Sequence, residues 1–224
     1  MKQLISFILL LSATVTFAQE LSARELFYDV TVTNLSKSQT FSPSVVVAHS
    51  DRYSMFTPGQ PASDALAVLA EDGNGVPLKD EALLSSAVSD VQISGGLLAP
   101  GESTTVRVKA TRKRDRITVV GMLVTTNDAF FAVRNQPLAT SPYSIGSRNL
   151  VTTVMADVYD SGTEANTEDC DHIPIPCGNF GVRATEGAEG FIHIHNGFHG
   201  IGDLDKATYD WRNPGAMVQI TPIR

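Results

Sequence analysis

Three of the five histidines of this chain lie in one segment, EGFIHIHNGFHGIGDLD. Alternate residues of an extended strand share a face, so His193 and His195 are expected to point to the same side. Imidazole is a good ligand for copper and zinc, and these two residues together with His199 therefore form a candidate transition-metal site. The alternative is a purely structural cluster, in which the rings hydrogen-bond loop carbonyls and nearby carboxylates.

Acidic residues gather in a second segment, DVYDSGTE, where Asp160 and Glu164 lie on either side of Gly162. Calcium prefers oxygen ligands, and such a loop can fold two carboxylates and some backbone carbonyls around one ion. Asp128 would join from a neighbouring loop, and Asp157 is a further candidate ligand. The alternative is an ordinary turn, because Asp, Ser and Gly favour turns without any ion.

The only two cysteines are Cys170 and Cys177, with two prolines between them. In an exported chain such a pair is expected to form a disulfide. Closing so short a loop contributes about 2 to 3 kcal/mol in the chain-entropy model. Two cysteines without a CxxC pair do not favour zinc or redox chemistry.

The first residues, MKQLISFILLLSATVTFAQE, have the pattern of an export signal. Lys2 supplies the positive end, an apolar run follows, and Thr16, Phe17 and Ala18 precede the expected cleavage. We therefore expect residues 1–18 to be a signal peptide and residues 19–224 to form one domain. No later segment approaches the roughly 20 apolar residues of a spanning helix, so no transmembrane segment is expected. The destination is the periplasm, the exterior or the cell surface.

The composition argues against nucleic acid as a partner. The chain has 24 acidic and 17 basic side chains and a formal net charge of -7, and no basic stripe is present. The one basic cluster, TRKRDR at residues 111–116, lies between two strand-like runs, and we interpret it as a solvated hairpin loop without a function of its own.

Period-two patterns elsewhere predict an all-β fold. ELFYDVTVTNL and STTVRVKA alternate apolar and polar residues, as half-buried antiparallel strands do, and FIHIH and AMVQITPI repeat the alternation near the C-terminus. RITVVGMLVTTN is apolar on both sides and indicates a central strand. One short helix is expected after Ser63 and Asp64, ending at Gly73. The prediction is an antiparallel β-sandwich with one or two short helices in loops.

Several phrases, taken in order, resemble the spondin N-terminal domain family, and in particular its exported bacterial members. They are YDVTVTNLSKSQTFSPSVVVAHS, MFTPGQPASDALAVLAEDG, VGMLVTTNDAFF, DVYDSGTEANTEDCDHIPIPCG, EGFIHIHNGFHGIGDL and YDWRNPGAMVQI. Animal members of the family, F-spondin and mindin, use this domain as an extracellular adhesion and matrix-binding module that is a β-sandwich and binds calcium. The resemblance therefore implies binding rather than catalysis.

The resemblance also implies a calcium site, residue by residue. Asp128 in NDAF resembles the aspartate of a conserved turn in the animal members, and YDSGTE resembles their YDAGTD loop at Asp160, Gly162 and Glu164. Ala129 replaces a tryptophan of that pattern. Glu164 replaces an aspartate, which keeps the carboxylate but lengthens the side chain.

These observations predict an exported calcium-binding adhesion or ligand-binding module that is not an enzyme. Its partner would be an extracellular or cell-surface protein or glycan. No GxSxG, HExxH or phosphate-binding glycine loop is present in the sequence. The alternative is a small copper or zinc oxidoreductase, because FIHIHNGFHG superficially resembles the copper-binding strand of superoxide dismutase. That enzyme's two-metal site needs six histidines, more than this chain contains.

Overall fold

The computed structural model describes residues 25–138 and 150–223. The predicted signal peptide lies outside the described residues. The strands are β1 (Glu25–Asn34), β2 (Val45–His49), β3 (Val88–Ile93), β4 (Ser103–Thr111), β5 (Arg116–Met122), β6 (Ala129–Pro137), β7 (Thr152–Asp160), β8 (His193–Ile194) and β9 (Ala216–Ile223). The helices are α2 (Asp64–Asp72), α3 (Val76–Leu83) and α4 (Lys206–Tyr209), with a 3-10 turn, η2 (Cys170–His172).

The strands form one antiparallel sheet that folds over on itself into two layers. Its order is β3-β2-β5-β6-β7-β9-β1-β4, and β8 pairs with β7 outside this path. The layers are continuous because the second half of β7 pairs with β6 and its first half pairs with β9. At the open seam, the Ser89 hydroxyl donates to the carbonyls of Ala48 and Lys109, and Asp90 accepts the Lys109 N–H. The predicted antiparallel β-sandwich is confirmed, in a nearly closed, barrel-like form.

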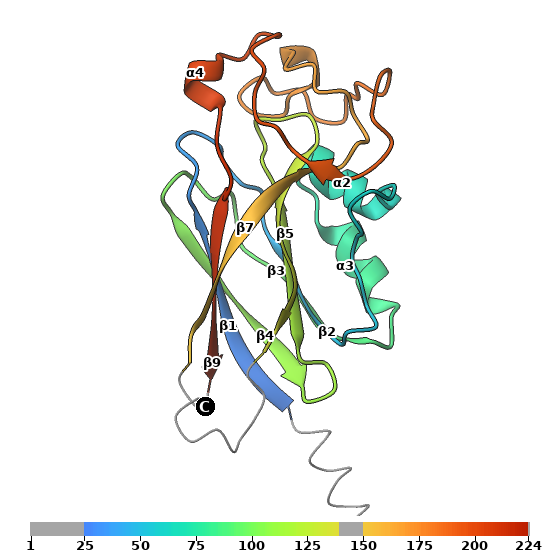
Figure 1. Ribbon diagram of the computed structural model, residues 1–224, viewed down its shortest axis with the longest axis vertical. Coiled ribbons are helices and arrows are strands. Elements are labelled where there is room, and N and C mark those ends of the chain that lie inside the picture. Colours follow the sequence, from blue (N-terminus) through green and yellow to red (C-terminus); the bar gives the residue numbers. More distant parts are fainter. Residues whose placement is uncertain (1–24, 139–149, 224) are drawn as a thin grey trace, which may run out of the picture.

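Two apolar cores follow from the strand patterns. Alternate residues of β1, Tyr28, Val30 and Val32, are buried between the layers, as the period-two pattern predicts. A second core lies on the other side of β2, where Val45 and Val47 contact residues of α2 and α3. Figure 1 shows these two helices beside the β2 and β5 strands, and both faces of this part of the sheet are therefore covered.

Helix α2 begins and ends where the sequence predicts. The Ser63 hydroxyl accepts the Leu66 N–H at 3.2 Å as an N-cap, and Gly73 ends the helix with φ 69°, a conformation that glycine adopts without strain. The remaining helices, α3, α4 and η2, are short and lie in connections. None of the described helices has the length and apolar character needed to cross a membrane.

Two local expectations are met only in part. The basic segment 111–116 contains a tight turn in which Thr111 and Arg114 exchange backbone hydrogen bonds, but no paired hairpin continues from it, because β4 pairs with β1 whereas β5 pairs with β2 and β6. The FIHIH strand contains only His193 and Ile194, since its pairing partner is the last part of β7, Tyr159 and Asp160. Most of the chain from Ser161 to Gly215 is loop, and Figure 1 shows it gathered at one end of the sandwich.

Candidate functional site

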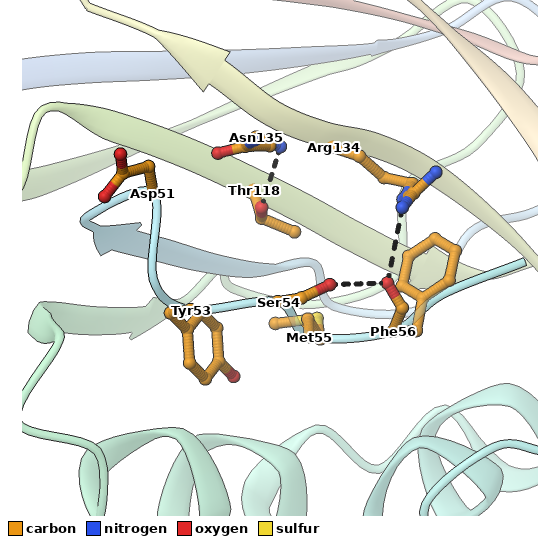
Figure 2. A pocket seen from close by; sticks show the side chains of 8 residues that line it. All are labelled: Asp51, Tyr53, Ser54, Met55, Phe56, Thr118, Arg134 and Asn135. Atoms are coloured by element: carbon orange, nitrogen blue, oxygen red, sulfur yellow. Dashed lines mark hydrogen bonds between the residues drawn. The ribbon is translucent and has the colours of Figure 1, made fainter. Parts of the chain in front are cut away.

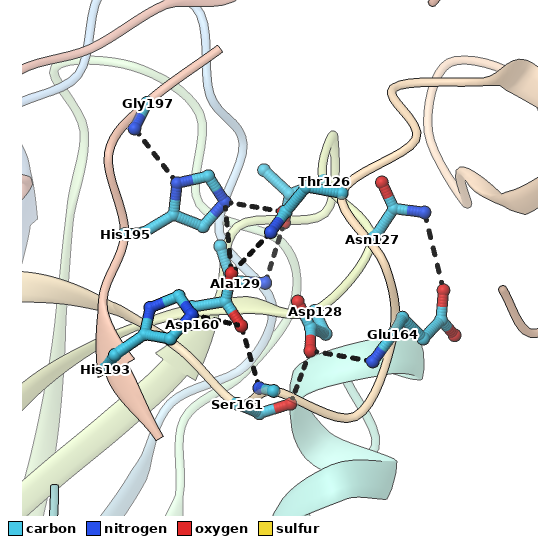
Figure 3. Close-up of polar contacts among 12 residues, drawn as sticks. Thr126, Asn127, Asp128, Ala129, Asp160, Ser161, Glu164, His193, His195 and Gly197 are labelled. Carbon is cyan, nitrogen blue, oxygen red and sulfur yellow. Dashed lines mark hydrogen bonds and ion pairs between the residues drawn. The ribbon is translucent and has the colours of Figure 1, made fainter. Parts of the chain in front are cut away.

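Asp128 lies in the turn before β6 and is fully buried. Its Oδ2 atom accepts three short hydrogen bonds, from the Ser161 hydroxyl at 2.8 Å, the Thr163 N–H at 2.8 Å and the Glu164 N–H at 3.0 Å. The other oxygen, Oδ1, has no hydrogen-bond partner. Burial raises the pKa of this carboxyl group. Figure 3 shows the bonded oxygen facing the 161–164 loop, with the other oxygen on the side of Asp160.

Asp160 is the last residue of β7, and strand pairing sets it opposite Ala129, directly after Asp128 in the chain. Its carboxylate accepts the Gly162 N–H at 2.7 Å through Oδ1 and the Asn166 side-chain N–H at 2.6 Å through Oδ2. Burial, followed by the negative charge of Asp128, raises the pKa of Asp160 to about 7. Two carboxylates that repel each other are therefore buried side by side.

Gly162 allows the acidic loop to pack closely on the segment that enters β8. Its φ is +68°, and a Cβ placed there would lie 2.3 Å from the Phe191 carbonyl oxygen. The Gly162 carbonyl also accepts the Gly190 N–H at 2.8 Å. Any other residue at this position would separate the two loops or distort one of them.

The Glu164 carboxylate is buried but faces away from Asp160. Its Oε2 lies 3.5 Å from the Asn127 amide nitrogen, and Figure 3 shows the group on the Asn127 side of the loop. Its Oε1 has no hydrogen bond and lies 3.5 Å from the Arg183 Nε atom. Burial, together with the charge of Glu71, raises the pKa of Glu164 to about 7.

Arg183 supplies positive charge on this side of the acidic loop. Its guanidinium contacts Glu71 and Asp72 of α2 as well as Glu164. One cation therefore serves three carboxylates, two of which, Glu71 and Glu164, are buried. The sequence did not indicate Arg183 or Glu71, because the three segments meet only in the folded chain.

Asp157 does not join the buried acids. It lies three residues before Asp160 on the same strand, so the two side chains point to opposite faces of the sheet, and Asp157 is exposed.

His195 is a buried, structurally satisfied histidine. The Gly197 N–H donates to its Nδ1 at 3.0 Å, so Nε2 carries the proton that is shared with the Asn166 side-chain oxygen at 2.9 Å. Burial lowers the pKa of His195 to about 3 and keeps the ring neutral. Neither ring nitrogen has a free lone pair for a metal.

The three histidines of the candidate transition-metal site are not brought together as one ligand set. His199 is half-exposed, with its Nδ1 atom 3.8 Å from Glu168. Within the described part of the chain, the group of three or more potential metal ligands that converges consists of Asp160, Glu189 and His193. His193 and His195 do face the same residue, since each Nε2 atom lies 3.9 Å from an oxygen of Asp160. Glu189 was not among the predicted ligands.

Away from the buried acidic residues, the structure has a hollow of about 100 Å³. It is lined by Asp51, Tyr53, Ser54, Met55, Phe56, Thr118, Arg134 and Asn135. Arg134 is the positively charged residue that lines this hollow. Its guanidinium already contacts the Phe56 ring at 4.9 Å and donates to the Phe56 carbonyl at 3.4 Å. Figure 2 shows Tyr53 pointing toward the helices rather than toward Arg134. This hollow contains no group of convergent ligands.

The model of one family, described as Spondin_N, matches residues 17–169. The chain belongs to the Spondin_N family. The match includes Asp128, Asp157, Asp160 and Glu164, whereas both cysteines and the histidine segment lie beyond its end. A search of curated proteins found no match.

The Spondin_N assignment agrees with a chain built for an oxidising compartment. Cys170 and Cys177 form a disulfide, as predicted from the sequence, and both half-cystines pack against the core between the layers. The disulfide joins η2 to the loop that follows it. Family and disulfide together are consistent with export of a non-catalytic extracellular module.

Proposed function

We propose that this Spondin_N protein is an exported, calcium-binding adhesion or ligand-binding module without catalytic activity. The observation that carries the proposal is the Oδ1 atom of Asp128, a carboxylate oxygen that is fully buried and has no hydrogen-bond donor. Buried polar atoms are almost always paired, and an unpaired charged oxygen costs several kcal/mol unless a cation or a proton compensates it.

The ligand chemistry of this site suits calcium. Asp128 and Asp160 offer hard oxygen donors from two segments, and calcium is held by carboxylate and carbonyl oxygens in a flexible geometry. Burial raises the pKa values of both groups despite the hydrogen bonds that the loop donates to them, so their ionised forms are disfavoured without an ion, and a divalent cation would offset this cost. Glu164 is the third candidate from the sequence, and its carboxylate, which points toward Asn127 and Arg183, would have to turn to reach the same ion. Asp157 is left out because it is exposed on the opposite face.

The proposed partner is an extracellular or cell-surface protein or glycan, recognised at the loop end of the sandwich in the periplasm, at the cell surface or outside the cell. The copper or zinc oxidoreductase alternative gains no support, because His195 has both ring nitrogens engaged and His199 lies apart.

Thermal unfolding in the presence of calcium or of a chelator tests calcium binding. An ion that binds only the folded state stabilises it by about 2.7 kcal/mol at a hundredfold excess over its dissociation constant, which corresponds to several degrees in a domain of this size. Asp160→Asn should remove most of that gain and still fold. Asp157→Asn is the matched control and should respond to calcium like the wild type. Identical melting of the wild type in both conditions would overturn the proposal.

Adhesion requires a separate experiment. The untagged protein, labelled on lysine, would be applied to a glycan array and to immobilised surface proteins of the producing cells, with calcium or with chelator. Calcium-dependent retention that Asp160→Asn loses supports the module, whereas no retention on either support argues against an adhesive role.

A further inference from the structure

His193 faces two carboxylates that no hydrogen bond links to it. Its Nε2 atom lies 3.9 Å from Oδ1 of Asp160 and 4.0 Å from Oε1 of Glu189. The three atoms lie within 4.8 Å of one another. They come from the end of β7, the loop before β8 and β8 itself, and strand pairing sets Asp160 directly opposite His193.

The second ring nitrogen of His193 indicates which atom carries the proton. Nδ1 lies 3.2 Å from the Ile194 carbonyl oxygen, and a carbonyl can only accept, so Nδ1 is the donor. In the neutral ring, Nε2 then presents a lone pair to the two carboxylates. This arrangement, with one ring nitrogen bonded to a backbone carbonyl and the other free, is the usual one for a metal-binding histidine.

Asp128 provides a second observation directly beside this group. Its partnerless Oδ1 atom is buried, and its charge acts on Asp160 while the charge of Glu189 acts on Asp128. In Figure 3 this oxygen lies on the side of Asp160 and His193. The ligand atoms that converge are those of Asp160, Glu189 and His193, and the buried Asp128 carboxylate adds negative charge beside them.

We propose that Asp160, Glu189 and His193 bind a divalent transition metal ion of the zinc class, beside the calcium position and sharing Asp160 with it. Zinc binds nitrogen and carboxylate ligands at about 2.0 to 2.2 Å, which places ligand atoms about 3.4 Å apart in a tetrahedral site. The two histidine-to-carboxylate separations of 3.9 and 4.0 Å therefore need to close by about 0.5 Å, and the separation between the two carboxylates, which is within 4.8 Å, by at most about 1.4 Å.

The side chains that must move are free to do so. The Glu189 side chain is 32% exposed and that of His193 is 26% exposed, whereas Asp160 is held by its two hydrogen bonds. The same exposure lets water occupy the fourth position. Imidazole distinguishes this site from the calcium position, because calcium takes oxygen ligands whereas zinc, cobalt and nickel also accept nitrogen.

Titration of the metal-free, untagged protein with zinc, followed by calorimetry, tests the proposal. We expect one zinc ion per chain, and cobalt in its place should give visible absorption bands of a low-symmetry site. His193→Gln and Glu189→Gln should each weaken zinc binding at least tenfold. The matched control is His199→Gln, which removes an exposed histidine of the same segment and should leave the zinc affinity unchanged.

The outcomes separate this site from the calcium site. In the His193→Gln protein the calcium-induced rise in melting temperature should persist, since no calcium ligand is lost. Absence of saturable zinc binding, or an equal loss in His199→Gln and His193→Gln, overturns the zinc site. If His193→Gln does not fold, the zinc affinity of Glu189→Gln serves as the test of the site. Zinc binding without any calcium response would instead overturn only the proposed function.

Discussion

The backbone N–H of Glu164 donates to Oδ2 of Asp128 at 3.0 Å, so one acid holds the loop that carries another. The same oxygen also accepts from Thr163 and Ser161. Oδ2 therefore orders the loop, while Oδ1 is left buried and unpaired. The two oxygens of one carboxylate have different roles, and substitution can separate them.

Asp128→Asn should make the metal-free protein more stable and abolish its calcium response. The amide oxygen can still accept the loop N–H groups, whereas the buried charge, which costs free energy without an ion, is gone. Melting temperatures in chelator should rise by a few degrees relative to the wild type, and added calcium should then change nothing. A variant that is less stable than the wild type in chelator would show that the charge itself is needed to hold the loop.

The stability of the metal-free protein should fall as the pH rises from about 4 to about 7. The folded-state pKa values of Asp160 and Glu164 are raised to about 7 from 3.8 and 4.5. A raised carboxyl pKa means that the folded state binds more protons than the unfolded state in this window, so ionisation favours unfolding. Urea unfolding in chelator at pH 4.5 and 7.5 measures the loss, for which we expect about 1 kcal/mol or more.

The double variant Asp160→Asn, Glu164→Gln is the reference for this pH experiment, because it retains every other titrating group. The difference between wild type and variant should shrink toward low pH. Adding calcium at pH 7.5 should restore the stability that the wild type loses in chelator. An equal pH dependence in both proteins would assign the effect to other residues.

Gly162→Ala should destabilise the fold by about 2 kcal/mol or more and weaken calcium binding. Its Cβ would meet the Phe191 backbone at 2.3 Å, in addition to the strain of a φ of +68°. Gly59→Ala is the matched control, since Gly59 has a φ of +82° and nothing within 4 Å of the added atom. Chemical unfolding of the two variants separates the effect of the close contact from that of backbone strain. Equal losses of unfolding free energy in both variants would show that the contact with Phe191 contributes nothing.

Replacing Cys170 and Cys177 with serine should cost about 2.5 kcal/mol, as expected for a short covalent loop. Intact mass of the native protein with and without reductant should differ by two hydrogens, and alkylation should require reduction. Denaturant unfolding of the double variant measures the cost. Ready alkylation of both thiols in the unreduced protein would show that the disulfide is not formed.

The strands and helix α2 could be predicted because their signals are local. The alternation around Val30 and Val32 identifies a half-buried strand, and the Ser63 cap and Gly73 give the limits of the helix. Asp157 could have been excluded in the same way, because a spacing of three on a strand puts it on the face opposite Asp160. The two-residue period of a strand is thus enough to assign Asp157 to the opposite face.

The site itself depends on loops that meet only after folding. Arg183 contacts Asp72 and Glu164 from a distant segment, and Glu189 approaches His193 and Asp160 through the pairing of β8 with β7. No spacing in the sequence encodes these contacts. The extent of the FIHIH strand was overestimated for the same reason, since the length of a strand depends on what pairs with it as well as on its own alternation.

Strand β7 is hydrogen-bonded to β6 through residues 157–160 and to β9 through residues 152–156. The two layers therefore cannot part without breaking backbone bonds of this one strand. Amide hydrogens in the middle of β7 should exchange with solvent only when the whole domain unfolds, as the slowest group in the chain. The Asp160 carboxylate at its end would thus be anchored to the most slowly opening element of the fold, while the loops that complete the proposed ion sites fluctuate on faster timescales.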